Sequence, residues 1–148
     1  MAESASYGDA TTPGPGPTDG SDSAGAPERR SLSEISNALV QVYKDQFGRG
    51  PTKVRTHYAG PDTLVCLLEQ TFTPAELNLQ AMDEHQRLRD IRLFFQYAER
   101  SRFTEPVERI TGRRVKAFVS GIDTHTDLAC ELFVLEADTR RENGDSSS

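Results

Sequence analysis

The stretch LVCLLEQTFTPAEL, residues 64–77, places an apolar strand directly before a helix start. Residues 64–68 are apolar on both faces, which is typical of an interior strand or of one covered by a partner. Thr73 then offers an N-cap, Pro74 suits the first helical position, and Glu76 completes a capping box. Because both elements are clearly marked, their neighbours can be assigned outward from this junction.

Upstream of the junction, the sequence predicts a helix and a second strand. A capping-box pattern at residues 31–34 precedes apolar residues that recur at helical spacing as far as Phe47. Gly48 is a natural helix stop. Residues 52–58 alternate in polarity, which predicts a half-exposed strand that pairs with the apolar strand.

Downstream, helices are expected from Thr73 to Gly112, followed by strands at residues 115–120 and 128–136. Pro106 lacks an amide hydrogen and should kink or split the helical region. The apolar stripe predicted for these helices consists of Leu77, Ala81, Leu88, Ile91, Phe95 and Ala98.

These elements predict an α+β fold, a two-layer sandwich of four mostly antiparallel strands with helices on one face. Their order is α-β-β-α-(α)-β-β. The other face of the sheet carries Val65 and Leu67, or Ala129, Phe133 and Leu135, depending on the register. An exposed apolar face of this kind predicts a homodimer.

Composition predicts one domain, at residues 31–137, between two disordered tails. Residues 1–30 and 138–148 are rich in small and polar residues and bury too little apolar surface to offset the entropy of ordering. No stretch approaches the roughly 18 apolar residues of a membrane-spanning helix. The first 30 residues contain no apolar core of a secretory signal, so a cytoplasmic location without membrane insertion is expected.

Charge and cysteine content exclude further classes of protein. The formal net charge of -6 argues against a generally basic nucleic-acid binder. Arginines between residues 87 and 114, Arg92 among them, alternate with acidic residues, which predicts a salt-bridged, solvated surface. The two cysteines, Cys66 and Cys130, lie in apolar strands and are expected to be buried core thiols.

Five basic residues are candidates for binding a ligand or a partner. Arg49 lies in a Gly-Arg-Gly-Pro loop, Lys53 and Arg55 follow in the first strand, and Arg113 and Arg114 precede the third. Glycines and arginine beside a helix end can hold a phosphate, but this loop follows a helix C-terminus, where the dipole is negative. The alternative to a phosphate site is that the Gly-Arg-Gly-Pro loop is a structural turn between the helix and the strand.

A weaker candidate is a metal site in the last hairpin. Asp123, His125 and Asp127 alternate there, and in an extended strand their side chains would share one side. Aspartate and threonine also favour plain turns, because their side chains bond to nearby backbone amides. No second cluster with ligand spacing accompanies them, so neither a metal nor another cofactor is predicted.

An ordered series of blocks runs through residues 31–137. It consists of Glu-Ile-Ser-Asn at 34–37, Gly-Arg-Gly-Pro at 48–51 with Lys53-Val54, Thr-Pro-Ala-Glu at 73–76, Thr-Gly-Arg at 111–113 continuing through Ser120 and Asp123, and Glu-x-Phe-Val-Leu-Glu at 131–136. The series resembles the MpsC-like family, formerly a domain of unknown function and named for the C component of a sodium-translocating, membrane-potential-generating system. The resemblance implies a bacterial protein that works with membrane ion-transport subunits, and it implies no catalytic residues.

Three functions stay open at this point. The first is a non-enzymatic cytoplasmic interaction or regulatory module, a peripheral accessory of ion transport, whose partner surface includes the loops of Arg49 and Arg113. The second is a small-anion or nucleotide sensor that uses the same two loops. The third is an uncharacterised enzyme, which is not expected because the sequence offers no nucleophile–base pair or metal cluster.

Overall fold

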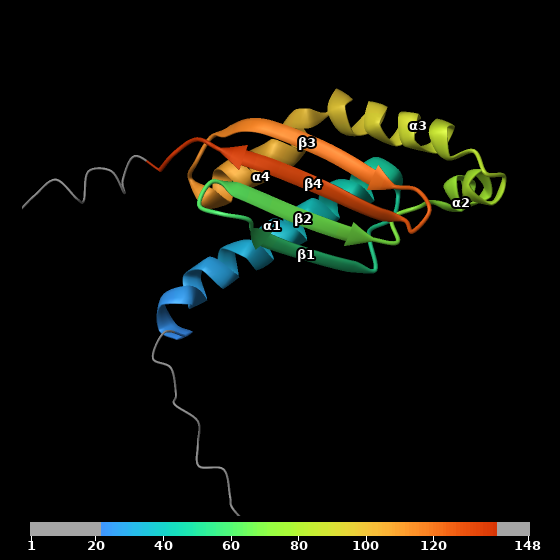
Figure 1. The fold of residues 1–148 in the computed structure, drawn as a ribbon. Coiled ribbons are helices and arrows are strands. Elements are labelled where there is room, and N and C mark those ends of the chain that lie inside the picture. Colours follow the sequence, from blue (N-terminus) through green and yellow to red (C-terminus); the bar gives the residue numbers. More distant parts are fainter. Residues whose placement is uncertain (1–21, 139–148) are drawn as a thin grey trace, which may run out of the picture.

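The structure is a computed structural model that describes residues 22–138 as two layers (Figure 1). Its elements are α1 (Asp22–Phe47), β1 (Lys53–Tyr58), β2 (Thr63–Glu69), α2 (Pro74–Ala81), α3 (His85–Ala98), α4 (Arg100–Thr111), β3 (Val115–Asp123) and β4 (Leu128–Leu135). The predicted α+β sandwich is confirmed, with three helices between its two hairpins. Of the tails predicted at residues 1–30 and 138–148, residues 1–21 and 139–148 lie outside the described part.

The described strands form one antiparallel sheet in the order β1-β2-β4-β3. β2 and β4 are therefore the central strands, which explains why both are apolar on their two faces. The register pairs Cys66 of β2 with Glu131 of β4, and Glu131 with Ser120 of β3. These three side chains consequently point to the same face of the sheet.

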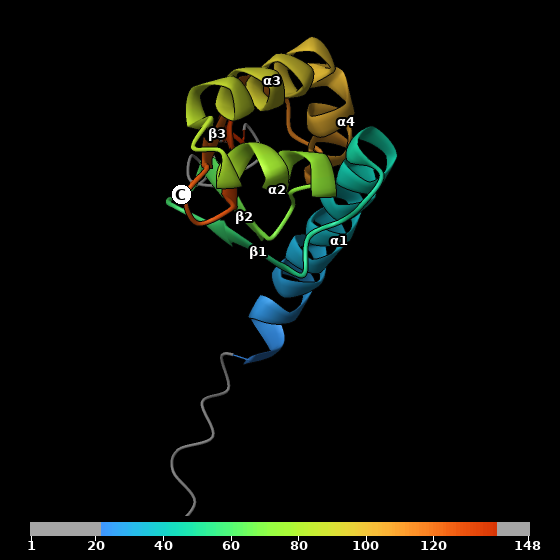
Figure 2. The same cartoon turned by 90° about the vertical axis from the view of Figure 1, so that its right-hand side faces the viewer.

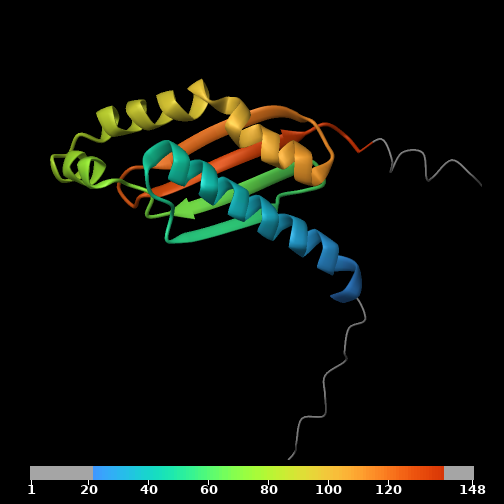
Figure 3. The same cartoon turned by 180° about the vertical axis from the view of Figure 1, so that it is seen from behind.

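The described helices lie on one side of the sheet (Figure 2). Seen from that side, α1 and α4 cross the sheet next to each other, and α3 runs along the β3 edge (Figure 3). We call the face toward α1 and α4 the inner face, and the opposite one the open face. The hydrophobic core between the layers contains Ile35, Leu39, Tyr43, Leu64, Cys66, Leu68, Phe103, Val107, Phe118, Ala129, Phe133 and Leu135.

The first helix begins earlier than predicted. α1 starts at Asp22, so the predicted capping box at residues 31–34 is wrong, and residues 22–30 are helical rather than part of a tail. Ser31 Oγ donates a hydrogen bond to the carbonyl oxygen of Pro27, one helical turn back. A serine can cap a helix start or bond within a continuing helix, and here it does the second.

The helix boundaries around α2 and at Gly48 follow the prediction. Thr73 Oγ1 accepts from the amide of Glu76, and Glu76 accepts from the amide of Thr73, so the capping box is complete. Gly48 adopts a φ of +79° at the end of α1, a conformation in which a side chain would be strained. These boundaries depend on local contacts, which is why the sequence predicts them.

The helical region from α3 onward departs from the prediction. It divides at Glu99, whereas Pro106 is buried inside α4. Of the predicted apolar stripe, α3 buries Leu88 as expected, but its other buried residues are the polar Arg92 and Gln96. Ile91 and Phe95 are each 46% exposed, so α3 turns a largely polar side toward the sheet and an apolar side outward.

Candidate functional site

A buried cluster of polar side chains lies where α1, α3, β4 and the start of α2 meet. We call it the polar core, and it consists of Tyr43, Glu76, Arg92, Gln96 and Glu131. Tyr43, Arg92, Gln96 and Glu131 are completely buried. Polar side chains are rarely buried without a strong local reason, which makes this cluster the most unusual feature of the described fold.

The carboxylate of Glu131 is held from two helices. Its Oε1 accepts from the Tyr43 hydroxyl at 2.6 Å and from Gln96 Nε2 at 2.8 Å. Burial raises the pKa of Glu131 to about 7, although the Tyr43 hydrogen bond, the Ser120 hydroxyl and the charge of Arg92 lower it in part. Burial likewise raises the pKa of Tyr43 well above its usual value. Glu131 therefore exchanges its proton in the physiological range.

Arg92 is the second charge of the polar core. Its guanidinium forms two bonds to the carboxylate of Glu76, one of them from Nη2 at 2.7 Å, and Nη2 also donates to the carbonyl of Thr71. The guanidinium carbon lies 3.7 Å from the centre of the Phe47 ring. Arg92 thus joins α3 to the capping box of α2 and to the end of α1. The prediction that it lies on a solvated surface is wrong.

Several polar atoms of this region lack a hydrogen-bond partner among the described residues. They include Oε2 of Glu131, Oε1 of Gln96, Oγ of Ser120 and Nη1 of Arg92. The Ser120 hydroxyl lies close enough to the Glu131 carboxylate to lower its pKa, yet it has no hydrogen-bond partner of normal geometry among the described residues. Unpartnered buried atoms are costly, so the polar core has capacity for a further proton or hydrogen bond.

The polar core was not predicted from the sequence. Two signals were present: Glu131 interrupts an otherwise apolar strand, and Leu88, Arg92 and Gln96 recur every four residues on one side of α3. The second pattern resembles an ordinary solvated helix face until the partner on β4 is known.

The open face is the second candidate site. Its side chains alternate with those of the core, and they include Val65, Leu67, Ala117, Val119, Leu128, Cys130, Leu132 and Val134. The first of the two predicted registers is therefore confirmed, and Ala129, Phe133 and Leu135 lie in the core instead. No described helix covers this apolar face (Figure 1).

A basic row borders the open face. Lys53, Arg55 and His57 are exposed on β1 and alternate with the inward residues of that strand. The carboxylate oxygens of Glu69 lie 4.0 Å from Lys53 Nζ and 3.8 Å from Arg55 Nη2. One negative charge therefore partly offsets two positive charges. Exposed ion pairs of this kind contribute little to stability, at about 0–1 kcal/mol.

The two predicted basic loops lie at opposite ends of the sheet. Arg49 Nη1 donates to the carbonyl of Phe72, near the β3–β4 turn. Arg113 donates to the carbonyls of Pro61 and Glu136 at the β1–β2 turn end. The strands between them span about 20 Å, so the structure does not unite Arg49 and Arg113 in one site. Arg114 is exposed beside Arg113.

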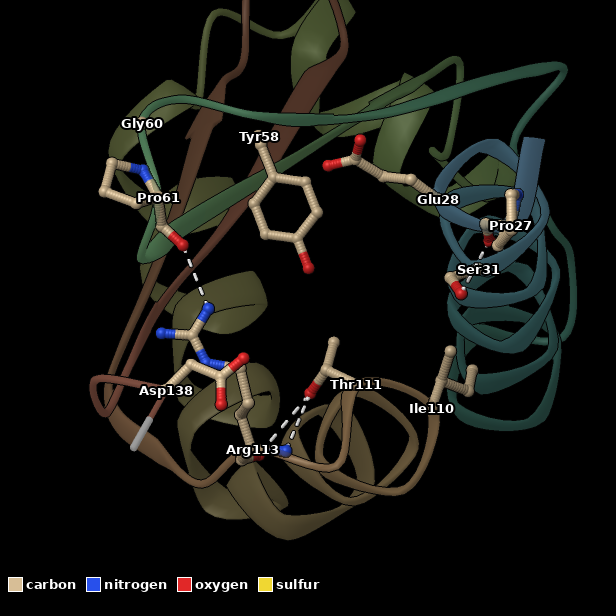
Figure 4. A pocket seen from close by; sticks show the side chains of 10 residues that line it. All are labelled: Pro27, Glu28, Ser31, Tyr58, Gly60, Pro61, Ile110, Thr111, Arg113 and Asp138. Atoms are coloured by element: carbon tan, nitrogen blue, oxygen red, sulfur yellow. Dashed lines mark hydrogen bonds between the residues drawn. The ribbon is translucent and has the colours of Figure 1, made fainter. Parts of the chain in front are cut away.

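Arg113 lines a half-open pocket of about 400 Å³ (Figure 4). The other lining residues are Pro27, Glu28, Ser31, Tyr58, Gly60, Pro61, Ile110, Thr111 and Asp138. The guanidinium donates hydrogen bonds to the carbonyl oxygens of Pro61 and Glu136, and it forms an ion pair with Asp62. Its contribution is therefore to fix the chain around the pocket, and it offers an anion little unused charge.

The residues of the weak metal candidate do not converge. Asp123 accepts from the amides of His125 and Thr126, which is an ordinary turn. Asp127 accepts from Thr71 and Phe72 and thereby joins the β3–β4 turn to the start of α2. His125 stacks on His85, with ring centres 3.8 Å apart. Within residues 22–138, no group of three or more metal-ligating side chains is assembled.

The two cysteines occupy opposite faces of the sheet. Cys66 is buried in the core, and Cys130 is half-buried on the open face. Burial raises the pKa of Cys66 to about 12, and burial also raises the pKa of Cys130. A reactive thiolate requires a lowered pKa, so neither thiol is placed as a nucleophile.

Comparison with known proteins gives one match. A family model described as "Na+-translocating membrane potential-generating system (MpsC)" matches residues 29–137, well over half of the chain. No curated protein matches the chain, and no solved structure does. In the described part of the chain, every helix is too short or too polar to serve as a membrane span.

Proposed function

Because the chain belongs to the MpsC family, we propose that it is a non-enzymatic accessory of a membrane ion-transport system, bacterial and cytoplasmic, that works as a homodimer. The observation that carries the proposal is the uncovered apolar open face. A contiguous apolar surface of this kind is typical of protein–protein interfaces. The predicted anion sensor is not carried forward, because Arg49 and Arg113 lie far apart and both bind backbone carbonyls.

The register of the sheet suggests how two copies would pair. One row of paired residues across the four strands consists of Lys53, Glu69, Leu128 and Asp123. The next row on the open face has Arg55 at its β1 end and Gly121 at its β3 end. A two-fold axis parallel to β2 and β4 places β1 of one copy over β3 of the other. Lys53 then faces Asp123 of the second copy.

The same axis places Arg55 over Gly121 of the second copy. No atom approaches within 4 Å of the position where a Gly121 side chain would begin, so this spot has room for a long side chain. The apolar residues of β2 and β4 would meet in the centre, as they do in aligned sheet packing. Charge complementarity at the edges and apolar contact in the centre both favour this arrangement.

Replacing Leu132 by lysine is expected to weaken the homodimer. Leu132 lies on the open face of β4, one of the two central strands, and a lysine there would bury an unpaired charge in the interface. We expect the dissociation constant to rise at least about tenfold, measured by sedimentation velocity over a micromolar concentration series.

The matched control is Phe94→Lys. Phe94 is a large apolar residue, 69% exposed, on α3 and outside the open face, so this variant should dimerise like the wild type. A wild-type chain that stays monomeric throughout the series would overturn the homodimer.

Association with transport subunits is testable by affinity purification of the tagged protein from gently solubilised native cells. We expect ion-transport subunits to be enriched over an untagged control. Arg114→Glu is a suitable variant for mapping the contact, because Arg114 is exposed, whereas Arg49 and Arg113 hold the fold together. Recovery of the protein alone would remove the transport association and leave the homodimer to be judged separately.

A further inference from the structure

α3 is attached to the rest of the molecule through polar groups as well as through the ring contacts of Tyr97 with Phe118 and of Phe95 with Phe47. Its buried side chains are Leu88, Arg92 and Gln96. Gln96 reaches Glu131 on β4, and the hydroxyl of Tyr97 bonds to the backbone of Ser120 on β3 at 2.9 Å. Such an attachment depends on the charge state of its partners far more than an apolar contact does.

The partner at the centre of this attachment is a carboxyl group without access to water. Glu131 is completely buried, and its Oε2 lacks a hydrogen-bond partner among the described residues. Ser120 Oγ, which belongs to the paired residue on β3, also lacks one. A proton on Oε2 would let the carboxyl group donate to an unpartnered oxygen, and it would remove the cost of a buried negative charge.

We propose that Glu131 is the proton-binding site of a latch that fastens α3 to the sheet. With the proton bound, the carboxyl group is neutral and α3 stays closed over it. Without the proton, local opening of α3 becomes easier, because opening lets water reach the carboxylate. The proposal concerns α3 and the inner face, and it does not depend on the homodimer or on a transport partner.

The groups that face Glu131 support this assignment. Tyr43 on α1 and Cys66 on β2 are themselves protonated, since burial raises the pKa of both. Arg92 on α3 is positive but is already paired with Glu76 on α2. The remaining neighbours carry no charge: Gln96 on α3, Ser120 on β3 and Cys130 on β4. α4 adds no charge to this interior, since its buried residues are Phe103, Thr104, Pro106 and Val107.

Glu131 is consequently the group of this cluster that changes charge near neutral pH, with a pKa raised to about 7. A carboxyl group exposed by opening returns to its ordinary pKa, near 4.5. The closed state therefore binds the proton more tightly than the open state, and rising pH favours opening between these two values.

Hydrogen exchange tests the latch. In the wild type, we expect the protection factors of the α3 amides, corrected for intrinsic exchange, to fall about fortyfold between pH 5 and pH 7. In Glu131→Gln, which is neutral at every pH, they should stay constant. Glu34→Gln is the control, since Glu34 is exposed on α1, and it should behave like the wild type.

If Glu131→Gln does not fold, titration of the Glu131 carboxyl group in the wild type tests the proposal instead. The carboxyl carbon of Glu131, followed by NMR, should titrate near pH 7, at the pH where loss of α3 protection levels off. Titration near pH 4.5, or α3 protection that does not change from pH 5 to pH 7, would overturn the latch. An equal fall in the wild type and in Glu131→Gln would do the same.

Discussion

Replacement of Arg92 by leucine is expected to lower the free energy of unfolding by about 3–5 kcal/mol. The substitution leaves the Glu76 carboxylate, whose side chain is 12% exposed, without its positive partner. It also removes the donor to the carbonyl of Thr71 and the cation that lies over the Phe47 ring. Chemical denaturation at pH 7 measures the effect.

Two further variants show how much of this loss of stability comes from leaving a buried charge unpaired, and how much from losing any arginine. Arg87→Leu removes an arginine that is 75% exposed and paired with Glu84, and it should cost less than about 1 kcal/mol. The double variant Arg92→Leu with Glu76→Gln should regain part of the loss, because no unpaired charge remains buried. Equal losses for Arg92→Leu and Arg87→Leu would show that burial of the ion pair is unimportant.

Glu131→Gln is expected to stabilise the protein at pH 8 by about 3 kcal/mol. The pKa of Glu131 is raised from 4.5 to about 7 in the folded state, so the folded state binds more protons than the unfolded state between these values. The stability of the wild type therefore falls as pH rises from about 4.5 to about 7, and it stays lower above pH 7. Glutamine keeps the shape and an acceptor oxygen while avoiding the buried charge.

Unfolding measured from pH 5 to pH 8 checks this expectation. The difference between wild type and Glu131→Gln should be small at the acid end and largest at the alkaline end. Contributions from groups that are common to both proteins cancel in the difference. A difference that is constant with pH would mean that Glu131 is not the titrating group.

The sequence predicted those parts of the fold that depend on neighbouring residues. The capping box of Thr73 and Glu76 sets the start of α2, and the alternation in β1 sets which of its side chains face the helices. Gly48 and Gly112 end their helices in the left-handed conformation. Each of these signals is complete within a few residues, so no knowledge of the sheet order was needed.

The candidate site could not be predicted in the same way. α3 carries apolar residues on one side and Leu88, Arg92 and Gln96 on another, and helical spacing alone favours burial of the apolar side. Glu131 on β4 and Glu76 on α2 reverse that choice, because they hold Gln96 and Arg92. Likewise, the distance between Arg49 and Arg113 is set by the sheet and not by either loop.

The position of β4 has a consequence for synthesis on the ribosome. β4 lies between β2 and β3, so the centre of the sheet joins a strand made early to one made much later. The β1–β2 hairpin emerges before the other two strands and exposes the edge of β2 until Leu128–Leu135 has been made. An unpaired apolar edge attracts other strands. Nascent chains that stop before Leu128 are therefore the form of this protein most in need of a chaperone.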